Sequence, residues 1–143
     1  IEDLGPQTCF VGRVDESDAD VTAAALREAY EEVGLEYRYV DVLGTLPVYT
    51  TGTAFQVTPV VALVQPDFTL LPNAFEVADT FEVPLTFLMD PAHHQRHTFE
   101  WEGVRREWFS MPFHETVAGE VRERFIWGAT AGMLRNFYRF LSA

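Results

Sequence analysis

Three glutamates close together, Glu28, Glu31 and Glu32, are the residues of this sequence best suited to chemistry. At about 100° per residue, a helix through them places their carboxylates within an arc of roughly 100°. Like charges at this spacing destabilise a helix by roughly 0.2–0.5 kcal/mol per pair, and Arg27 offsets part of that repulsion. A hard cation such as Mg²⁺ or Mn²⁺ offsets more, because it takes oxygen ligands. Helix geometry alone leaves two interpretations open, a metal site and a solvated acidic face.

The element that positions these carboxylates is a helix predicted over Asp20–Val33. Asp18 or Asp20 can cap its N-terminus, and Gly34 stands where a left-handed residue closes a helix. Its opposite side is apolar and is expected to pack on a core; this side carries Ala23, Leu26, Tyr30 and Val33.

The residues from Arg27 to Leu35, REAYEEVGL, resemble the core of the Nudix box. That motif reads Arg-Glu, an apolar residue, any residue, Glu-Glu, any residue, Gly and an apolar residue. Upstream, Gly12 is followed by five residues, Asp18, and then eight residues before Arg27. The general box has a glutamate there and one residue fewer. Both departures are features of the coenzyme A pyrophosphatase-like branch, which Asp15 also matches.

Three later segments are similar to the same branch. They are the Asn-x-x-Glu-Val loop at Asn73–Val77, the strand at Phe81–Leu85 and the Ile-Trp-Gly-x-Thr-Ala segment at Ile126–Ala131. The resemblance implies an α/β Nudix fold, an α/β/α sandwich around a mixed β-sheet, and residues 1–143 as a single domain. The part before Gly12 lacks the upstream Arg-Ser block of the branch, so we expect it to be atypical or incomplete.

The resemblance implies that Glu28, Glu31 and Glu32 bind Mg²⁺ or Mn²⁺, with the Gly12 carbonyl as a further ligand. Arg27 would orient these carboxylates. The general base is either a box glutamate, for which Glu31 is the candidate, or an acid of a later loop. Glu76 is the loop candidate, with Glu82 behind it.

Three arginines, Arg13, Arg105 and Arg106, are candidates for binding substrate phosphates, because arginine forms a fork that matches phosphate. A solvated strand residue is the competing interpretation for Arg105 and Arg106. His93, His94 and His97 are expected to be polar loop residues and not metal ligands, because no helical or cysteine spacing supports such a site.

The implied activity is cleavage of the diphosphate of coenzyme A or its derivatives, giving 3′,5′-ADP and 4′-phosphopantetheine or its acyl form. Two alternatives stay open. One is a Nudix hydrolase for another nucleotide, such as a dinucleotide, ADP-ribose or a nucleoside diphosphate sugar. The other is a Nudix-fold module that binds a nucleotide without cleaving it, against which the complete glutamate set argues.

The composition is that of a globular domain, with 143 residues and 48% hydrophobic residues. A net charge of −12 argues against nucleic-acid binding, and bound cations reconcile that charge with a phosphorylated substrate. The sequence has no apolar run of membrane-spanning length, so we expect no membrane partner. Cys9 is the single cysteine, which favours a reducing compartment, and we therefore expect a cytoplasmic protein. A homodimer is an open alternative to a monomer.

The remaining pattern predicts strands mixed with short helices. Strands are expected at Tyr37–Leu46, Phe55–Val64 and Phe75–Val83, and a short helix at Leu85–Met89. A hairpin of His97–Trp101 with Arg105–Phe109 should turn at Glu102-Gly103. A final amphipathic helix is expected over Phe125–Leu141.

Overall fold

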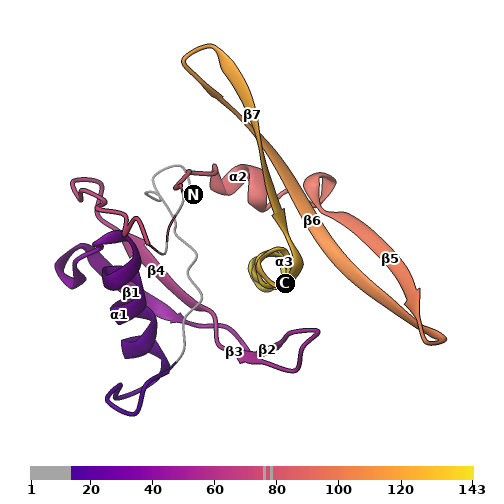
Figure 1. The fold of residues 1–143 in the computed structure, drawn as a ribbon, viewed down its shortest axis with the longest axis horizontal. Helices are drawn as coiled ribbons and strands as arrows, with labels where there is room; N and C mark the ends of the chain where they lie inside the picture. Colours follow the sequence, from indigo (N-terminus) through magenta and orange to yellow (C-terminus); the bar gives the residue numbers. More distant parts are fainter. Residues whose placement is uncertain (1–13, 76, 78) are drawn as a thin grey trace. The chain divides into compact units, whose positions relative to one another are not determined.

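The computed structural model describes residues 14–75, 77 and 79–143 (Figure 1). The expectations for Cys9, Gly12, Arg13 and Glu76 fall outside these residues. The chain divides into two compact units, Ile1–Glu82 and Val83–Ala143, and each is described by itself.

Helix α1, Val21–Val33, is the central element of the first unit. The Asp20 side chain caps it by accepting a hydrogen bond from the Ala23 amide at 2.8 Å. Gly34 ends it with φ of 69°, and its N–H donates to the Tyr30 carbonyl at 2.9 Å. The helix predicted from Asp20 to Val33 is therefore confirmed, with Asp20 as the capping residue.

The apolar side of α1 packs on a small core. Ala29 and Val33 are buried together with Leu35 and Val64. Val64 ends strand β4, Val60–Val64, which pairs antiparallel with β1, Val40–Thr45. Helix and hairpin thus share one core, and the carboxylate side of α1 is left outside it.

Two strand predictions in this unit were too long. The segment Tyr37–Tyr39 forms a 3₁₀ turn, so the first strand begins at Val40. The strand predicted over Phe55–Val64 is divided into β3, Gln56–Val57, and β4. Pro59 lies at the break, because proline has no N–H to donate to a strand ladder. Strand β3 pairs with β2, Tyr49–Thr50.

The strand predicted over Phe75–Val83 was wrong, because no described residue of that range belongs to a strand. The chain before it is bound instead to the end of α1. Leu71 N–H donates to the Val33 carbonyl at 2.6 Å, and Asn73 N–H donates to the Glu32 carbonyl at 2.7 Å. These bonds satisfy carbonyls that a helix end otherwise leaves unpaired.

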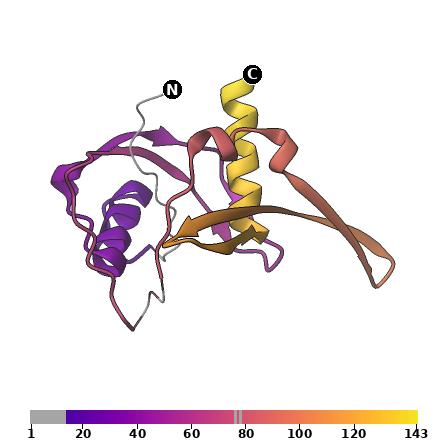
Figure 2. The same cartoon turned by 90° about the horizontal axis from the view of Figure 1, so that it is seen from above.

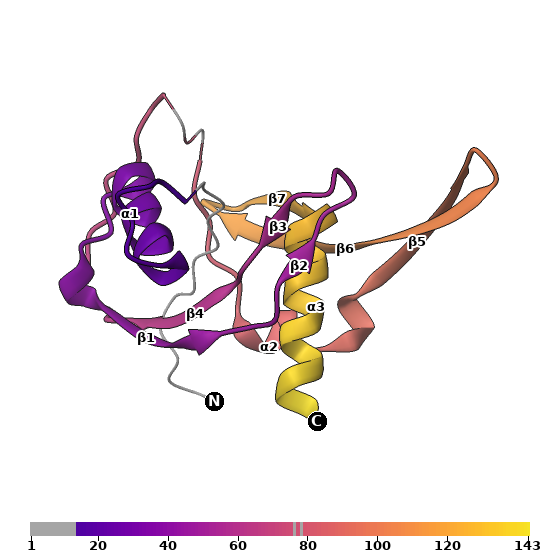
Figure 3. The same ribbon diagram turned by 90° about the horizontal axis from the view of Figure 1, so that it is seen from below.

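The second unit is built on one long strand, β6, Val104–Val117. Its first half pairs with β5, Gln95–Trp101, and its second half pairs with β7, Glu120–Trp127 (Figure 3). The predicted turn at Glu102-Gly103 is confirmed, with φ of 49° and 76°. The extension of β6 beyond Phe109 and the whole of β7 were not predicted.

Helices complete the second unit. The short helix α2, Leu85–Leu88, matches its prediction and is followed by a 3₁₀ turn at Pro91–His93. Helix α3, Gly128–Ser142, lies against β6 and β7 (Figure 2). It begins at Gly128 and not at Phe125, because Phe125–Trp127 belong to β7. Its residue Ala131 is buried in one core cluster with Leu88, Met111 and Ile126.

The mixed α/β content expected from the resemblance is confirmed by these elements. Every strand pair among the described residues is antiparallel. Within the described ranges, no helix is long and apolar enough to cross a membrane.

Candidate metal-binding site on helix α1

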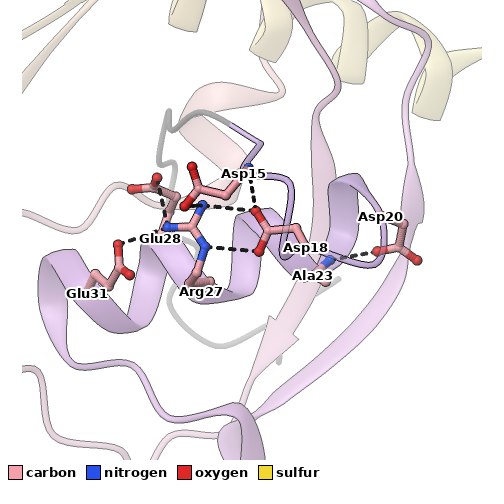
Figure 4. Close-up of polar contacts among 7 residues, drawn as sticks. All are labelled: Asp15, Asp18, Asp20, Ala23, Arg27, Glu28 and Glu31. Atoms are coloured by element: carbon pink, nitrogen blue, oxygen red, sulfur yellow. Dashed lines mark hydrogen bonds and ion pairs between the residues drawn. The ribbon is translucent and has the colours of Figure 1, made fainter.

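The guanidinium of Arg27 is the centre of the charged side of α1 (Figure 4). Its Nε and Nη2 donate to the two carboxylate oxygens of Asp18, both at 3.0 Å. Its Nη1 donates to Glu31 Oε2 at 3.0 Å and to Glu28 Oε1 at 3.3 Å. Nη2 also lies 3.5 Å from a carboxylate oxygen of Asp15. One arginine therefore fixes the direction of two of the predicted metal ligands.

The Asp18 carboxylate holds this arginine from the turn before the helix. Its side chain is only 6% exposed, against 61% for Asp15. The Asp15 amide donates to Asp18 Oδ2 at 2.8 Å, and the Asp18 amide donates to the Asp15 carbonyl at 3.0 Å. These two hydrogen bonds within the turn fix the position of the Asp18 carboxylate that accepts from Arg27.

The hydrogen bonds of this network shift the pKa values of Asp18 and Arg27 in the directions that favour their charged forms. The hydrogen bonds from Arg27 and from the Asp15 backbone lower the pKa of Asp18. The hydrogen bond to Asp18 and then that to Glu31 raise the pKa of Arg27. The pair therefore stays ionised at neutral pH.

The donor set on α1 suits a hard divalent cation in its chemistry, because Glu28, Glu31 and Glu32 offer only carboxylate oxygens. In this structure, Glu28 and Glu31 turn toward Arg27, and no three His, Cys, Asp or Glu side chains of the described residues form a metal-binding cluster. Each of these two carboxylates is seen to use one oxygen for Arg27, and a carboxylate has further lone pairs to give. Arginine and cation can thus share the same side chains.

The loop after Pro72 is organised by Asn73, the first residue of the Asn-x-x-Glu-Val segment. Its side-chain Oδ1 accepts from the Phe75 amide at 3.0 Å, and its carbonyl accepts from the Val77 amide at 2.8 Å. Val77 packs on the core formed under α1. The signal was present in the Pro-Asn pair, because asparagine side chains close turns of this kind.

Gly34 allows this loop to approach the helix. A Cβ at position 34 would lie 2.9 Å from Leu71 Cβ and 3.3 Å from the Leu71 backbone nitrogen and oxygen. The loop that carries position 76 therefore starts in direct contact with the end of the carboxylate helix.

The remaining candidates belong to other segments of the chain. Glu82 is exposed at the end of the first unit. Arg105 and Arg106 belong to the second unit, on β6, where they stand opposite Glu100 and Phe99.

The three histidines serve the second unit's own structure. His93 stacks on Phe87 and bonds the Phe87 carbonyl at 2.9 Å. His94 bonds the Leu88 carbonyl at 2.7 Å through Nε2 and lies 3.2 Å from Arg135 through Nδ1. The expected loop position is wrong for His97, which lies in strand β5.

The family model of the NUDIX domain matches residues 8–111 of this chain. The chain belongs to the Nudix family. The match contains α1 with all three glutamates and runs on into β6. Nudix hydrolases generally use divalent metal ions, which agrees with the oxygen-rich side of α1.

Curated Nudix relatives match most of the chain. The chain is 41% identical over 126 residues to "Uncharacterized Nudix hydrolase NudL" of Cronobacter sakazakii. It is 38% identical over 126 residues to proteins of that name from Enterobacter sp. and from Escherichia coli O1:K1 / APEC. Each alignment covers 87% of this chain and 61% of the relative. The chain therefore spans less than two thirds of the length of these relatives.

Proposed function

We propose that this chain is a Mg²⁺- or Mn²⁺-dependent Nudix pyrophosphohydrolase that cleaves coenzyme A or its derivatives to 3′,5′-ADP and 4′-phosphopantetheine or its acyl form. The observation that carries the proposal is the Arg27 network, in which Asp18 holds the arginine and the arginine orients Glu28 and Glu31. The aspartate at position 18 is the form found in the coenzyme A pyrophosphatase-like branch.

In this proposal Glu28, Glu31 and Glu32 hold the cation, with the Gly12 carbonyl as a further ligand. The bound cation supplies charge stabilisation for the diphosphate oxygens and acidifies the attacking water. Arg27 acts on the carboxylates, because it donates hydrogen bonds to Asp18, Glu28 and Glu31. The cation would also neutralise part of the acidic face of α1, so that a polyanionic substrate can approach.

Proton removal from the attacking water is assigned to Glu76, with Glu31 as the alternative. Support for Glu76 comes from its neighbours, since Asn73 is bonded to Glu32 and Val77 packs on the core under α1. Position 76 itself lies outside the described residues.

Residues 1–143 are proposed to act as one domain, because the family match continues across the boundary between the two units. The proposed partner is a small nucleotide substrate.

The test is a substrate panel with purified protein. Coenzyme A, ADP-ribose, NADH and a dinucleoside polyphosphate are each incubated with Mg²⁺ or Mn²⁺, with and without a chelator. Coenzyme A should be turned over with the highest kcat/KM, and chelation should abolish turnover. Preference for another substrate would replace the coenzyme A assignment, and binding without any turnover would show a nucleotide-binding module.

A further inference from the structure

The hairpin of β5 and β6 has two chemically different faces. Residues paired across an antiparallel ladder project to the same side, and successive residues alternate. One side, here named the aromatic face, carries His97, Phe99, Trp101, Val104, Arg106 and Trp108. The opposite side carries Arg96, Thr98, Glu100, Arg105, Glu107 and Phe109. Adjacent arginines 105 and 106 therefore lie on opposite faces.

Ring contacts agree with this assignment. The His97 ring stacks on Trp108, with centroids 4.0 Å apart and planes 18° apart. Trp127 of β7 meets Trp108 edge to face at 6.2 Å and so extends the aromatic face. Beneath these rings, His97 Nε2 and Ser110 Oγ are joined by a hydrogen bond of 2.7 Å. The stacked rings are thus held in place by the buried serine.

Helix α3 lies on the opposite side of the sheet. Arg135 of α3 stands 4.7 Å over the Phe109 ring, and Met111 belongs to the core that α3 covers. The aromatic face stays open to solvent, with Trp101 64% exposed and Trp127 61% exposed. All three tryptophans of the chain lie on it.

The aromatic face also carries a cation. Arg106 stands opposite Phe99 and two positions from Trp108. It is exposed in a chain whose net charge is −12. Flat rings beside an arginine are complementary to a nucleotide, because bases stack on aromatic side chains and arginine pairs with phosphate.

We propose that the aromatic face binds the purine base of an adenine nucleotide by stacking, while Arg106 binds its phosphate. This rests on the proposed function, because the nucleotide half of coenzyme A, released as 3′,5′-ADP, has these two groups. A second copy of the chain is the less suitable occupant. A symmetric contact through this face would bring the two copies of Arg106 toward each other, at a cost in charge repulsion.

The experiment is a titration of intrinsic tryptophan fluorescence with 3′,5′-ADP in the presence of a chelator, so that the readout does not depend on turnover. A saturable change is expected. Arg106→Ala should weaken binding by about tenfold or more, because a charged hydrogen bond is lost. Arg105→Ala is the matched control from the opposite face and should leave the affinity within about twofold. Circular dichroism and thermal melts verify that both variants fold.

Adenosine and inorganic phosphate separate the two contacts. Each should bind more weakly than 3′,5′-ADP, and Arg106→Ala should weaken phosphate binding while sparing adenosine. The inference is overturned if the fluorescence does not change and calorimetry detects no binding. It is also overturned if both arginine variants lose equal affinity, or if Trp101→Ala converts a dimer to monomers without altering nucleotide binding.

Turnover of coenzyme A with Mg²⁺ or Mn²⁺ on the same samples keeps the two proposals distinct. Wild-type protein that binds 3′,5′-ADP on the aromatic face but does not cleave coenzyme A contradicts the proposed function alone. Wild-type protein that cleaves coenzyme A, with Arg106→Ala unchanged in both KM and nucleotide affinity, contradicts the aromatic-face inference alone.

Discussion

The polar networks of the two units differ in how far along the chain they reach. The Arg27 network joins residues from Asp15 to Glu31, and its described bonds and ion pairs span at most twelve positions. In the second unit, the bond between Arg135 and His94 spans 41 positions, and that between His97 and Ser110 spans 13. The first network orients charged side chains of one helix and the turn before it, whereas the second joins separate elements around a core. Changes in the first should therefore alter chemistry, and changes in the second should alter stability.

The largest effect is expected from Glu32→Gln on the proposed turnover. Loss of one metal-binding charge should lower kcat by orders of magnitude, about a hundredfold or more, as transition-state charge loses its stabilisation. Stability should be unchanged or slightly higher, because the acidic face becomes less crowded. Steady-state kinetics at saturating metal and a urea melt measure both.

Glu36→Gln is the matched control for that variant, because Glu36 is half exposed and pairs with Arg38 at 2.7 Å. Its turnover should equal that of the wild type. Near-normal turnover in Glu32→Gln would remove Glu32 from the ligand set.

Glu76→Gln tests the proposed base against the ligands. Turnover should fall by about 10²–10⁴-fold, the typical contribution of proton transfer, while the metal concentration at half-maximal activity stays constant. If affinity for the metal falls in parallel, Glu76 is a ligand. If neither quantity changes, the role passes to Glu82 or to Glu31.

Gly34→Ala should destabilise the protein by about 1–3 kcal/mol. The backbone of Gly34 has a left-handed φ of 69°, which disfavours any residue with a Cβ. The added Cβ would also lie 2.9 Å from Leu71 Cβ. Gly103→Ala is the control, because Gly103 has a similar φ of 76° but no atom lies within 4 Å of the Cβ that the substitution would add. Urea unfolding of both variants separates backbone strain from the loop contact. Equal losses would show that contact between the loop and the helix contributes nothing.

His94→Ala should cost about 1–3 kcal/mol in unfolding free energy without changing turnover. It leaves the Leu88 carbonyl without the donor 2.7 Å away and removes the partner of Arg135. His114→Ala is the comparison, because that side chain is 60% exposed and 4.0 Å from Glu123; it should change stability by less than about 0.5 kcal/mol. A loss of turnover in His94→Ala at full stability would contradict the division of roles between the units.

The smallest effect is a pH dependence at Asp18. Because its folded-state pKa is lowered, its ionised form stabilises the fold above the ordinary value of 3.8, and this contribution disappears as the pH falls through the lower folded-state value. The Tm of Asp18→Asn should lie below that of the wild type at neutral pH by a constant amount, and the gap should close in acid. A gap that persists unchanged to the lowest pH would assign the loss to packing.

Sequence reasoning succeeded where the determinants were local. The limits of α1 follow from Asp20 and Gly34, each of which acts on the adjacent turn. The hairpin at Glu102-Gly103 followed in the same way from its turn residues. The charge pattern of Asp18, Arg27 and Glu31 also lies within one stretch of chain, so the candidate site could be named before its geometry was seen.

Prediction failed where long-range partners decide. Phe125–Trp127 looked like the start of a helix, but they pair with Ser110–Pro112 across the sheet. The turn before them was missed because Ala118, at φ of 51°, stands where asparagine or glycine normally marks a hairpin. The apolar residues of 75–83 suggested a strand, yet hydrogen bonds to the end of α1 fix the chain just before them.

The divided pairing of β6 has a consequence for backbone amide exchange. In the part of the chain that the structure describes, each half of β6 has one neighbouring strand, β5 before Ser110 and β7 after it. Successive N–H groups of an antiparallel strand point to opposite edges, so only alternate amides of each half meet a partner. Strands β5 and β7 lie on opposite edges of β6. If the slowly exchanging amides before Ser110 belong to residues of even number, those after Ser110 should therefore belong to residues of odd number, and the reverse.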